Sequence, residues 1–183
     1  MIDHIVFDVD GTLTDGGLLL SDAGELKRFD VKDGLIIAAL PKLGYTTIFL
    51  TGRRSDVTSL RAAELGISLV VQGVSDKAAV LRTIFDEKGV DGKRFAYIGD
   101  DLNDYEAMKL CSFRACPVDA VQEIKELCNY VSYAKAGYGA ARDVCEQLLR
   151  KQNQFDALFA MQTSFVRPLP HGEFLEVNHI KYM

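Results

Sequence analysis

The stretch HIVFDVDGTLTDGG, residues 4–17, determines how the rest of the chain can be interpreted. In it, a run of three apolar residues stops at two aspartates, Asp8 and Asp10, which are separated by a single valine. The apolar run predicts a buried strand over residues 5–10, and the glycines that follow predict a turn. Two carboxylates this close repel each other unless a cation lies between them or one of them holds a proton. The stretch therefore predicts a strand whose carboxyl end carries a charged site.

The remainder of the chain alternates between short apolar runs and amphipathic stretches, a pattern typical of βαβ units. Further strands are predicted at 46–52, 68–73, 95–101, 113–118 and 130–133, and helices at 35–44, 55–66, 76–89, 102–111, 120–128 and 139–159. Residues 18–34 contain two short alternating pieces around a turn, which predicts a β-hairpin. We therefore expect an α/β fold: a Rossmann-like parallel sheet with helices on both faces and a hairpin flap at 18–30.

The composition of the 183 residues is that of a globular chain, with 48% apolar and 26% charged residues. We expect a single domain at 1–159 and a tail at 160–183, where the periodic pattern is lost. The formal net charge of −5 argues against nucleic-acid binding and against attachment to anionic membranes. No apolar run approaches the ~20 residues of a membrane span, and no signal-peptide pattern is present, so the expected location is the cytoplasm.

Three predicted strands end in polar clusters: DVDGT (8–12), LTGR (50–53) and IGDD (98–101). Because the carboxyl ends of parallel strands meet at one edge of the sheet, all three clusters are expected to face one crevice. An aspartate that only caps a turn would explain one such cluster, but not its recurrence at a second strand end. Several carboxylates in one crevice require a cation, and oxygen-rich sites of this kind favour Mg²⁺, which usually also contacts a substrate phosphate.

Groups of the opposite charge are predicted in the same crevice. Thr51, Gly52 and Arg53 offer a hydroxyl, backbone N–H groups and a guanidinium. Lys77 begins a predicted helix, where a positive charge is unfavourable unless an anion lies nearby. A solvated surface lysine and a surface salt bridge of Arg53 are the alternative interpretations. Together with a carboxylate nucleophile, these groups indicate phosphoryl transfer, in which an aspartate can attack phosphorus and a second one can protonate the leaving alcohol.

In order and spacing, DVDGT (8–12), Thr51, Lys77 and GDDLND (99–104) resemble the four motifs of the haloacid dehalogenase-like phosphatase superfamily. The resemblance implies that Asp8 is the nucleophile and Asp10 the general acid and base. It also implies that Thr51 and Lys77 hold the phosphoryl oxygens. The metal ligands implied are the Asp8 carboxylate, the Asp10 backbone carbonyl and Asp100, and the residues implied to support the metal, directly or through water, are Asp101 or Asp104.

The gaps between these motifs are too short for the cap domain that most members of the superfamily insert. The sequence thereby resembles the capless, tetrameric 3-deoxy-D-manno-octulosonate 8-phosphate phosphatase family over about residues 3–150. This resemblance implies that Arg53 and Arg61 recognise an anionic sugar acid and that Asp33 and Gly34 line its site. It also implies that the hairpins form the core of a homotetramer, in keeping with three successive leucines at 18–20. The implied role of the C-terminal segment is to reach toward the active site of a neighbouring subunit.

The chain departs from the pattern of that family at three positions: Ile36, Ala38 and Tyr138. The resemblance to the family implies that the substrate is a sugar-acid phosphate such as 3-deoxy-D-manno-octulosonate 8-phosphate. Because of the three departures, other substrates are considered as well. The alternatives are a nine-carbon sialic-type acid phosphate, another small phosphomonoester, or a non-catalytic oligomerisation domain. Arg53 favours the eight-carbon acid, and the intact aspartates disfavour a domain without activity. A phosphomutase would need a cap to retain its intermediate.

Overall fold

Strand β1 (His4–Phe7) lies inside the six-stranded sheet of the computed structural model, which describes residues 1–22 and 24–163. It pairs in parallel with β4 (Thr46–Thr51) on one side and with β6 (Phe95–Ile98) on the other. The order of the sheet is β5-β4-β1-β6-β7-β8, and every pair is parallel. The outer strands are β5 (Leu69–Gln72), β7 (Phe113–Cys116) and β8 (Tyr130–Val131). The predicted α/β class and parallel sheet are confirmed.

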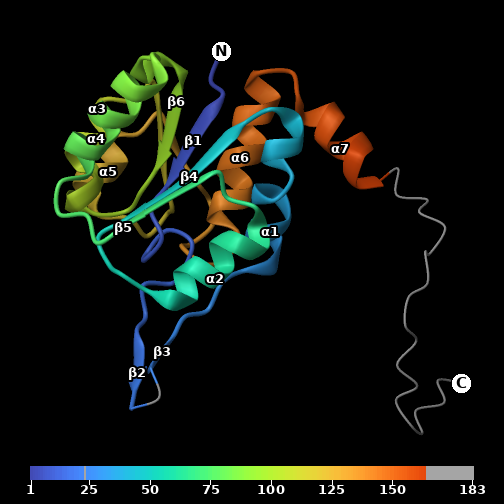
Figure 1. Ribbon diagram of the computed structural model, residues 1–183. Helices are drawn as coiled ribbons and strands as arrows, with labels where there is room; N and C mark the ends of the chain where they lie inside the picture. Colours follow the sequence, from blue (N-terminus) through green and yellow to red (C-terminus); the bar gives the residue numbers. More distant parts are fainter. Residues whose placement is uncertain (23, 164–183) are drawn as a thin grey trace, which may run out of the picture.

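Helices cover both faces of the sheet (Figure 1). One face carries α1 (Val31–Ile37), α2 (Asp56–Leu65) and α6 (Ala140–Lys151), and the other carries α3 (Lys77–Lys88), α4 (Tyr105–Lys109) and α5 (Gln122–Leu127). Successive side chains of β1 point to opposite faces, so Ile5 and Phe7 join one apolar core and Val6 joins the other. This double burial explains why the strand is continuously apolar.

The predicted hairpin is present as β2 (Leu19–Ser21) and β3 (Gly24–Leu26), which pair antiparallel and project away from the sheet (Figure 1). It is the only insertion between β1 and α1, and the described residues contain no cap domain. The chain also contains short 3₁₀ turns: η1 (Leu40–Leu43), η2 (Gly92–Arg94) and η3 (Leu102–Asp104). The carboxyl edge of the sheet is therefore not covered by a domain of this chain within those residues.

The predicted helix at 35–44 begins and ends earlier than expected. Helix α1 starts at Val31 because the Asp30 side chain accepts a hydrogen bond from the backbone N–H of Lys32 and caps it. It stops at Ile37 and is followed by η1, where Pro41 cannot donate a helical hydrogen bond. The pair Asp33-Gly34 consequently lies within a helix rather than in a loop.

The helix predicted at 139–159 is two helices. Helix α6 ends at Lys151, and α7 (Phe155–Thr163) begins after a turn in which Asn153 has a positive φ of 57°. The helical periodicity continues across the turn, and asparagine tolerates the left-handed conformation better than most residues, so the break carries little sequence signal. Helix α7 also runs past residue 159. Residues 164–183 of the predicted tail lie outside the described residues.

Strand β1 is shorter than the predicted 5–10. The chain leaves the sheet at Asp8, and the backbone N–H groups of residues 12–14 converge on the carbonyl oxygen of Val9. This turn holds Asp8 and Asp10 at the carboxyl edge of the sheet instead of within it.

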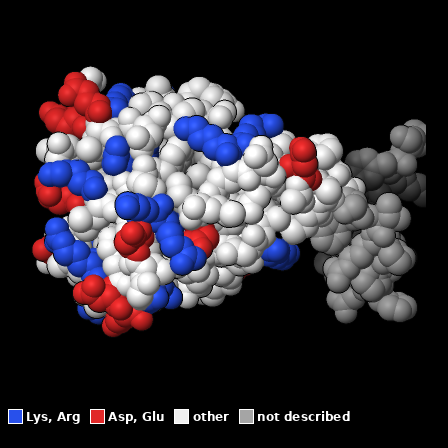
Figure 2. Space-filling model, turned by 90° about the horizontal axis from the view of Figure 1, so that it is seen from above, with Lys and Arg blue, Asp and Glu red and all other residues white. Residues whose placement is uncertain are grey.

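Acidic and basic side chains are interspersed on the face of the molecule shown in Figure 2. Such mixing agrees with the modest net charge of −5. None of the helices within residues 1–22 and 24–163 combines the length and the apolar character that a membrane span needs.

Candidate active site

The centre of the site is an ion pair between Lys77 and Asp8. Lys77 is the first residue of α3, yet its side chain is buried, and its Nζ donates to Oδ1 of Asp8 at 2.6 Å. The same Nζ donates to Oδ1 of Asp104, also at 2.6 Å. Burial opposes the charged form of Lys77, but the two carboxylates outweigh it and raise the pKa of the ammonium group. The unfavourable position of a lysine at a helix start is thus explained by its anionic partners.

Asp104 is fully buried and connects the lysine to the sheet. Its Oδ1 also accepts a hydrogen bond from the Tyr97 hydroxyl at 2.7 Å, and its Oδ2 accepts one from the backbone N–H of Asp100 at 3.1 Å. Both oxygens are therefore already engaged by the protein. A carboxylate with these contacts orients Lys77 and the Asp100 loop, as expected for a residue that supports a metal site from behind.

Asp100 comes from the loop after β6 and lies next to β1. Its Oδ1 accepts a hydrogen bond from the Thr12 hydroxyl at 2.9 Å. Gly11 has a φ of 92°, and a side chain at this position would collide with the Asp100 carboxylate. The glycine of DVDGT is therefore required both by its own backbone conformation and by the close approach of Asp100.

One carboxylate oxygen from each of Asp8, Asp100 and Asp104 lies within 4.8 Å of the others, so the three side chains surround a space where a metal ion could be held. Burial and the neighbouring Asp104 raise the pKa of Asp8 well above its usual value, although Lys77 opposes the shift. Burial, together with Asp104, raises the pKa of Asp100 to about 6. Three carboxylates facing one ammonium group carry an excess of negative charge, which a divalent cation would balance. The donor set consists of hard oxygens, and it fits Mg²⁺.

Asp10 points toward a second cation, Lys27, which the sequence analysis did not single out. Lys27 directly follows β3 of the hairpin, and its Nζ lies 2.7 Å from Oδ1 and 3.0 Å from Oδ2 of Asp10. Arg53 lies further away, with its Nε 4.0 Å from Oδ2 of Asp10. In the sequence Lys27 resembles the exposed Lys32 of the same segment, so no local signal distinguishes the two.

Thr51, Gly52 and Arg53 follow one another at the end of β4, the strand beside β1. Thr51 is buried, and its Oγ1 accepts a hydrogen bond from the backbone N–H of Arg53 at 3.3 Å. Gly52 is exposed. The Arg53 side chain is half exposed and lies 3.7 Å from Glu25 of the hairpin. The predicted hydroxyl and guanidinium thus lie at the same edge of the sheet as Asp8.

Arg61 lies on α2, and its side chain lies beside α1, the helix that contains Asp33 and Gly34. Arg61 donates to Glu64 and to the backbone carbonyl of Asp30, and Gly34 leaves room for its guanidinium. Asp33 is buried and accepts hydrogen bonds from the N–H groups of Gly139 and Arg142, which caps the start of α6. Within the described part of the chain, none of the three predicted residues hydrogen-bonds to Asp8, Asp10 or Lys77. Their predicted contact with substrate stays a prediction.

The remaining positions of interest lie apart from the carboxylate cluster. Asp101 is exposed, and its Oδ1 accepts a hydrogen bond from the N–H of Leu102 at 2.7 Å. Ile36 is fully buried in the core between α1 and the sheet, and Ala38 follows the end of α1. Tyr138 is exposed, and the guanidinium of Arg28 lies 4.0 Å from the centre of its ring. Of the two aspartates offered as metal support, only Asp104 lies in the cluster.

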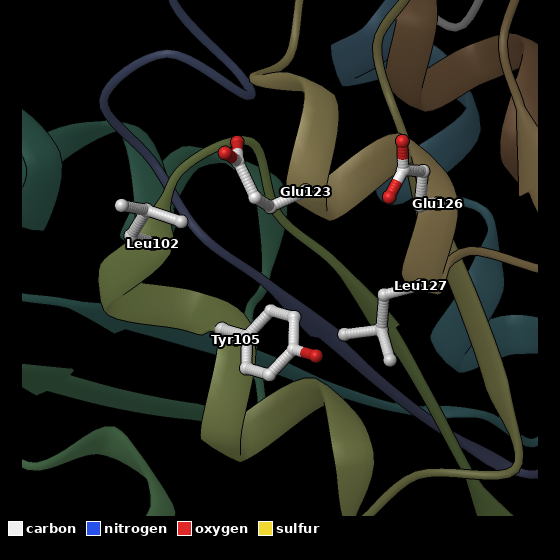
Figure 3. A pocket seen from close by; sticks show the side chains of 5 residues that line it. All are labelled: Leu102, Tyr105, Glu123, Glu126 and Leu127. Atoms are coloured by element: carbon white, nitrogen blue, oxygen red, sulfur yellow. The ribbon is translucent and has the colours of Figure 1, made fainter.

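A cavity of about 380 Å³ lies elsewhere, between η3, α4 and α5. Figure 3 shows its lining: Leu102, Tyr105, Glu123, Glu126 and Leu127. It has two carboxylates but no basic side chain, so it cannot neutralise a phosphate. The cluster at the carboxyl ends of β1, β4 and β6 is therefore the candidate active site.

Comparisons with known proteins agree with this assignment. The sequence pattern of haloacid dehalogenase-like hydrolases matches residues 61–142, and together with the relatives described next it defines the class of the protein as a haloacid dehalogenase-like hydrolase. The 3-deoxy-D-manno-octulosonate 8-phosphate phosphatase of Escherichia coli strain K12 is 33% identical over 153 residues, which cover 83% of this chain and 81% of the relative. The chain belongs to the 3-deoxy-D-manno-octulosonate 8-phosphate phosphatase family, and it is a phosphatase.

Two solved structures of the family are similar along most of their length. The phosphatase from Moraxella catarrhalis, in complex with magnesium ion, phosphate ion and KDO molecule, is 38% identical with a TM-score of 0.84, and the match covers 88% of this chain and 93% of that one. The cobalt-bound phosphatase from Haemophilus influenzae is 33% identical with a TM-score of 0.82, and the match covers 88% and 95%.

Proposed function

We propose that this protein hydrolyses the phosphate ester of 3-deoxy-D-manno-octulosonate 8-phosphate in a Mg²⁺-dependent reaction through an aspartyl-phosphate on Asp8. The observation that carries the proposal is the buried contact of Asp8 with Lys77 beside Asp100. A nucleophilic carboxylate, a cation for the phosphoryl oxygens and a carboxylate for a metal are then present at one edge of the sheet. Phosphoryl transfer needs little more than this positioning and charge neutralisation.

In the proposed reaction, an Asp8 oxygen attacks phosphorus, and the bond between phosphorus and the sugar oxygen breaks. Asp10 gives its proton to that departing oxygen, and the free sugar acid leaves. Asp10 then takes a proton from a water molecule, which attacks the aspartyl-phosphate and releases inorganic phosphate and the Asp8 carboxylate. Lys77 and Thr51 stabilise the negative charge on the phosphoryl oxygens throughout.

Mg²⁺, held by the Asp8 carboxylate, the Asp10 backbone carbonyl and Asp100, would neutralise the carboxylates and the phosphate and allow them to approach each other. Asp104 is proposed to keep Lys77 and the Asp100 loop in place, since both of its oxygens are engaged by them and by Tyr97. Asp101 is not proposed to contribute, because it is exposed and caps η3.

The choice of substrate rests on the names of the relatives and on Arg53. A guanidinium at the rim of the crevice suits the carboxylate of a sugar acid. Of the three departures, Ile36 and Ala38 lie in or beside the apolar core rather than at the crevice, so these two do not argue against this substrate, whereas Tyr138 is exposed beside Arg28. A nine-carbon sugar-acid phosphate is the alternative, and it differs in the length of the chain rather than in the reaction.

We further propose that the active form is a homotetramer assembled through the hairpin. Leu19, Leu20 and Leu26 are each about two-thirds exposed or more on a projecting two-stranded ribbon. An isolated hairpin with apolar side chains on its surface is marginal in water, and contact with other copies would cover them. We place the protein in the cytoplasm, where its four free cysteines would remain reduced.

The test is phosphate release with and without Mg²⁺ from three compounds: the eight-carbon substrate, a nine-carbon sialic-type acid 9-phosphate and an ordinary sugar phosphate. The expected result is turnover that requires Mg²⁺ and is fastest with the eight-carbon acid. The Asp8→Asn variant should lose this activity, and an equally active variant would indicate that the site is not used. No turnover of any of the three compounds would overturn the proposal.

A further inference from the structure

The hairpin contributes a buried cation to the active site. Lys27 stands directly after β3, and its side chain is only 1% exposed although it comes from a projecting element. Its Nζ contacts both oxygens of the Asp10 carboxylate, at 2.7 and 3.0 Å, and donates to the Thr58 hydroxyl at 3.3 Å. A buried ammonium group is costly unless it is paired and hydrogen-bonded, so these contacts account for its position.

Among the described residues, Lys27 is the cation that lies closest to the Asp10 carboxylate. Oδ1 of Asp10 is buried and accepts no hydrogen bond from the described residues, so its 2.7 Å contact with Lys27 is an ion pair alone, and the next cation, the half-exposed Arg53, lies 4.0 Å from Oδ2. Without Lys27 the carboxyl group would be free to rotate about its side-chain bonds. A general acid needs its proton within hydrogen-bond reach of the leaving oxygen, so rotation would lower its effectiveness.

Lys27 is itself fixed by more than one part of the fold. Thr58 lies on α2 and is fully buried, and Glu25 of β3 lies 3.7 Å from Arg53, in the segment between β4 and α2. The base of the hairpin is thus joined to the loop between β4 and α2. Lys27, which contacts Asp10, is thus itself tied to α2 through Thr58.

We infer that Lys27 is a positioning residue that holds the Asp10 carboxyl group in the orientation required for proton transfer to the leaving oxygen. The inference rests on the proposed function, in which Asp10 is the general acid. It assigns the hairpin a part in catalysis within its own subunit, in addition to any role in assembly.

The leaving group provides the test. Nitrophenolate leaves without protonation, whereas an alkoxide needs a general acid. In the Lys27→Met variant, kcat/KM should fall about 100-fold for glycerol 2-phosphate and less than about fivefold for p-nitrophenyl phosphate. Because glycerol 2-phosphate has no carboxylate, the loss cannot come from a contact with the sugar acid. Lys32→Met removes an exposed positive charge from the same segment and should change neither value.

A second comparison covers the case in which Lys27→Met folds poorly. Adding Lys27→Met to Asp10→Asn removes both charges of the pair, and the double variant should be as active toward p-nitrophenyl phosphate as Asp10→Asn alone. Equal losses on both substrates, or a further loss in the Asp10→Asn background, would overturn the positioning role. If the unmodified protein also releases no phosphate from 3-deoxy-D-manno-octulosonate 8-phosphate in the presence of Mg²⁺, the proposed function itself has failed, independently of Lys27.

Discussion

Lys77 and Asp8 are 69 positions apart in the chain, yet Nζ of Lys77 lies 2.6 Å from Oδ1 of Asp8 in the buried centre of the site. The contact places a cation beside the proposed nucleophile, where the phosphoryl group would arrive. It also compensates part of the charge of three neighbouring carboxylates. We therefore expect the same side chain to serve both catalysis and stability.

Replacing this lysine should damage both properties. We expect Lys77→Met to lower kcat/KM for any phosphomonoester by about 100- to 1000-fold, because the charge on the phosphoryl oxygens loses a cation. Asp8 and Asp104 would keep their burial without their partner, which should cost about 3–5 kcal/mol of unfolding free energy near neutral pH. Steady-state kinetics and urea unfolding measure the two effects. Lys88→Met, at the exposed far end of α3, is the control and should behave like the unchanged protein.

The Tyr97 hydroxyl should affect both stability and kcat, because it donates a hydrogen bond to Asp104. Tyr97→Phe removes the 2.7 Å hydrogen bond to a buried carboxylate, so we expect a loss of about 1.5–3 kcal/mol in urea unfolding and a decrease of about tenfold in kcat. Burial and Asp104 raise the pKa of Tyr97 well above its usual value, so the hydroxyl stays a donor over the whole pH range of the assay. Tyr105→Phe makes the same change in the cavity of Figure 3 and should leave kcat unchanged. A Tyr97→Phe enzyme of full activity would show that the orientation of Asp104 does not depend on the phenol.

Metal binding should stabilise the protein in a pH-dependent way. At 100 times its Kd, Mg²⁺ should add about 2.7 kcal/mol, which corresponds to roughly 5–10 °C in the melting temperature. Because the pKa of Asp100 is raised to about 6, the ion must displace a proton below that pH, and the increase should be smaller at pH 5 than at pH 7.5. Asp100→Asn should abolish the increase, whereas Asp101→Asn, which alters an exposed neighbour, should retain it. Equal responses of the two variants would contradict the ligand assignment.

Asp33 should contribute a separate pH dependence to stability. Burial raises its pKa from 3.8 to about 6, so the folded protein binds more protons than the unfolded chain between these values. Stability from this group is therefore complete below about pH 4 and is lost as the pH rises to about 6, by at most about 3 kcal/mol. In urea unfolding with EDTA, the Asp33→Asn variant should gain stability relative to the unchanged protein over this range. In the control Asp86→Asn, at an exposed position, the free energy of unfolding should change with pH as it does in the unchanged protein. The same pH dependence in Asp33→Asn as in the unchanged protein would contradict the assignment.

The hairpin leucines should determine the oligomeric state. Leu20 is 72% exposed on β2, and a charge there would have to be buried at the proposed subunit contact. We expect Leu20→Glu to shift the sedimentation coefficient from that of a tetramer to that of a smaller species. Leu60→Glu is closely matched, because Leu60 is 71% exposed but lies on α2. A monomeric unchanged protein, or the same response to both substitutions, would argue against assembly through the hairpin.

Most of the secondary structure could be predicted, because each element depends on local periodicity and on its own end signals. Gly66 and Gly89 end α2 and α3 in the left-handed conformation, at the positions that the pattern indicates. The errors occurred where a single capping side chain or a single backbone angle decided the outcome. Asp30 starts α1 early, and Asn153 divides the last predicted helix without interrupting its apolar pattern.

The sequence alone determined the α/β class and the convergence of Asp8, Thr51 and Asp100, because parallel strands present their carboxyl ends at one edge and these residues directly follow such strands. It could also indicate Lys77, since a lysine at a helix start needs an anionic partner. Only the tertiary structure decided that Lys27 faces Asp10 and that Asp33 caps α6. These contacts join segments that are far apart in the chain, and their energies come from burial and charge pairing, which no local pattern of residues encodes.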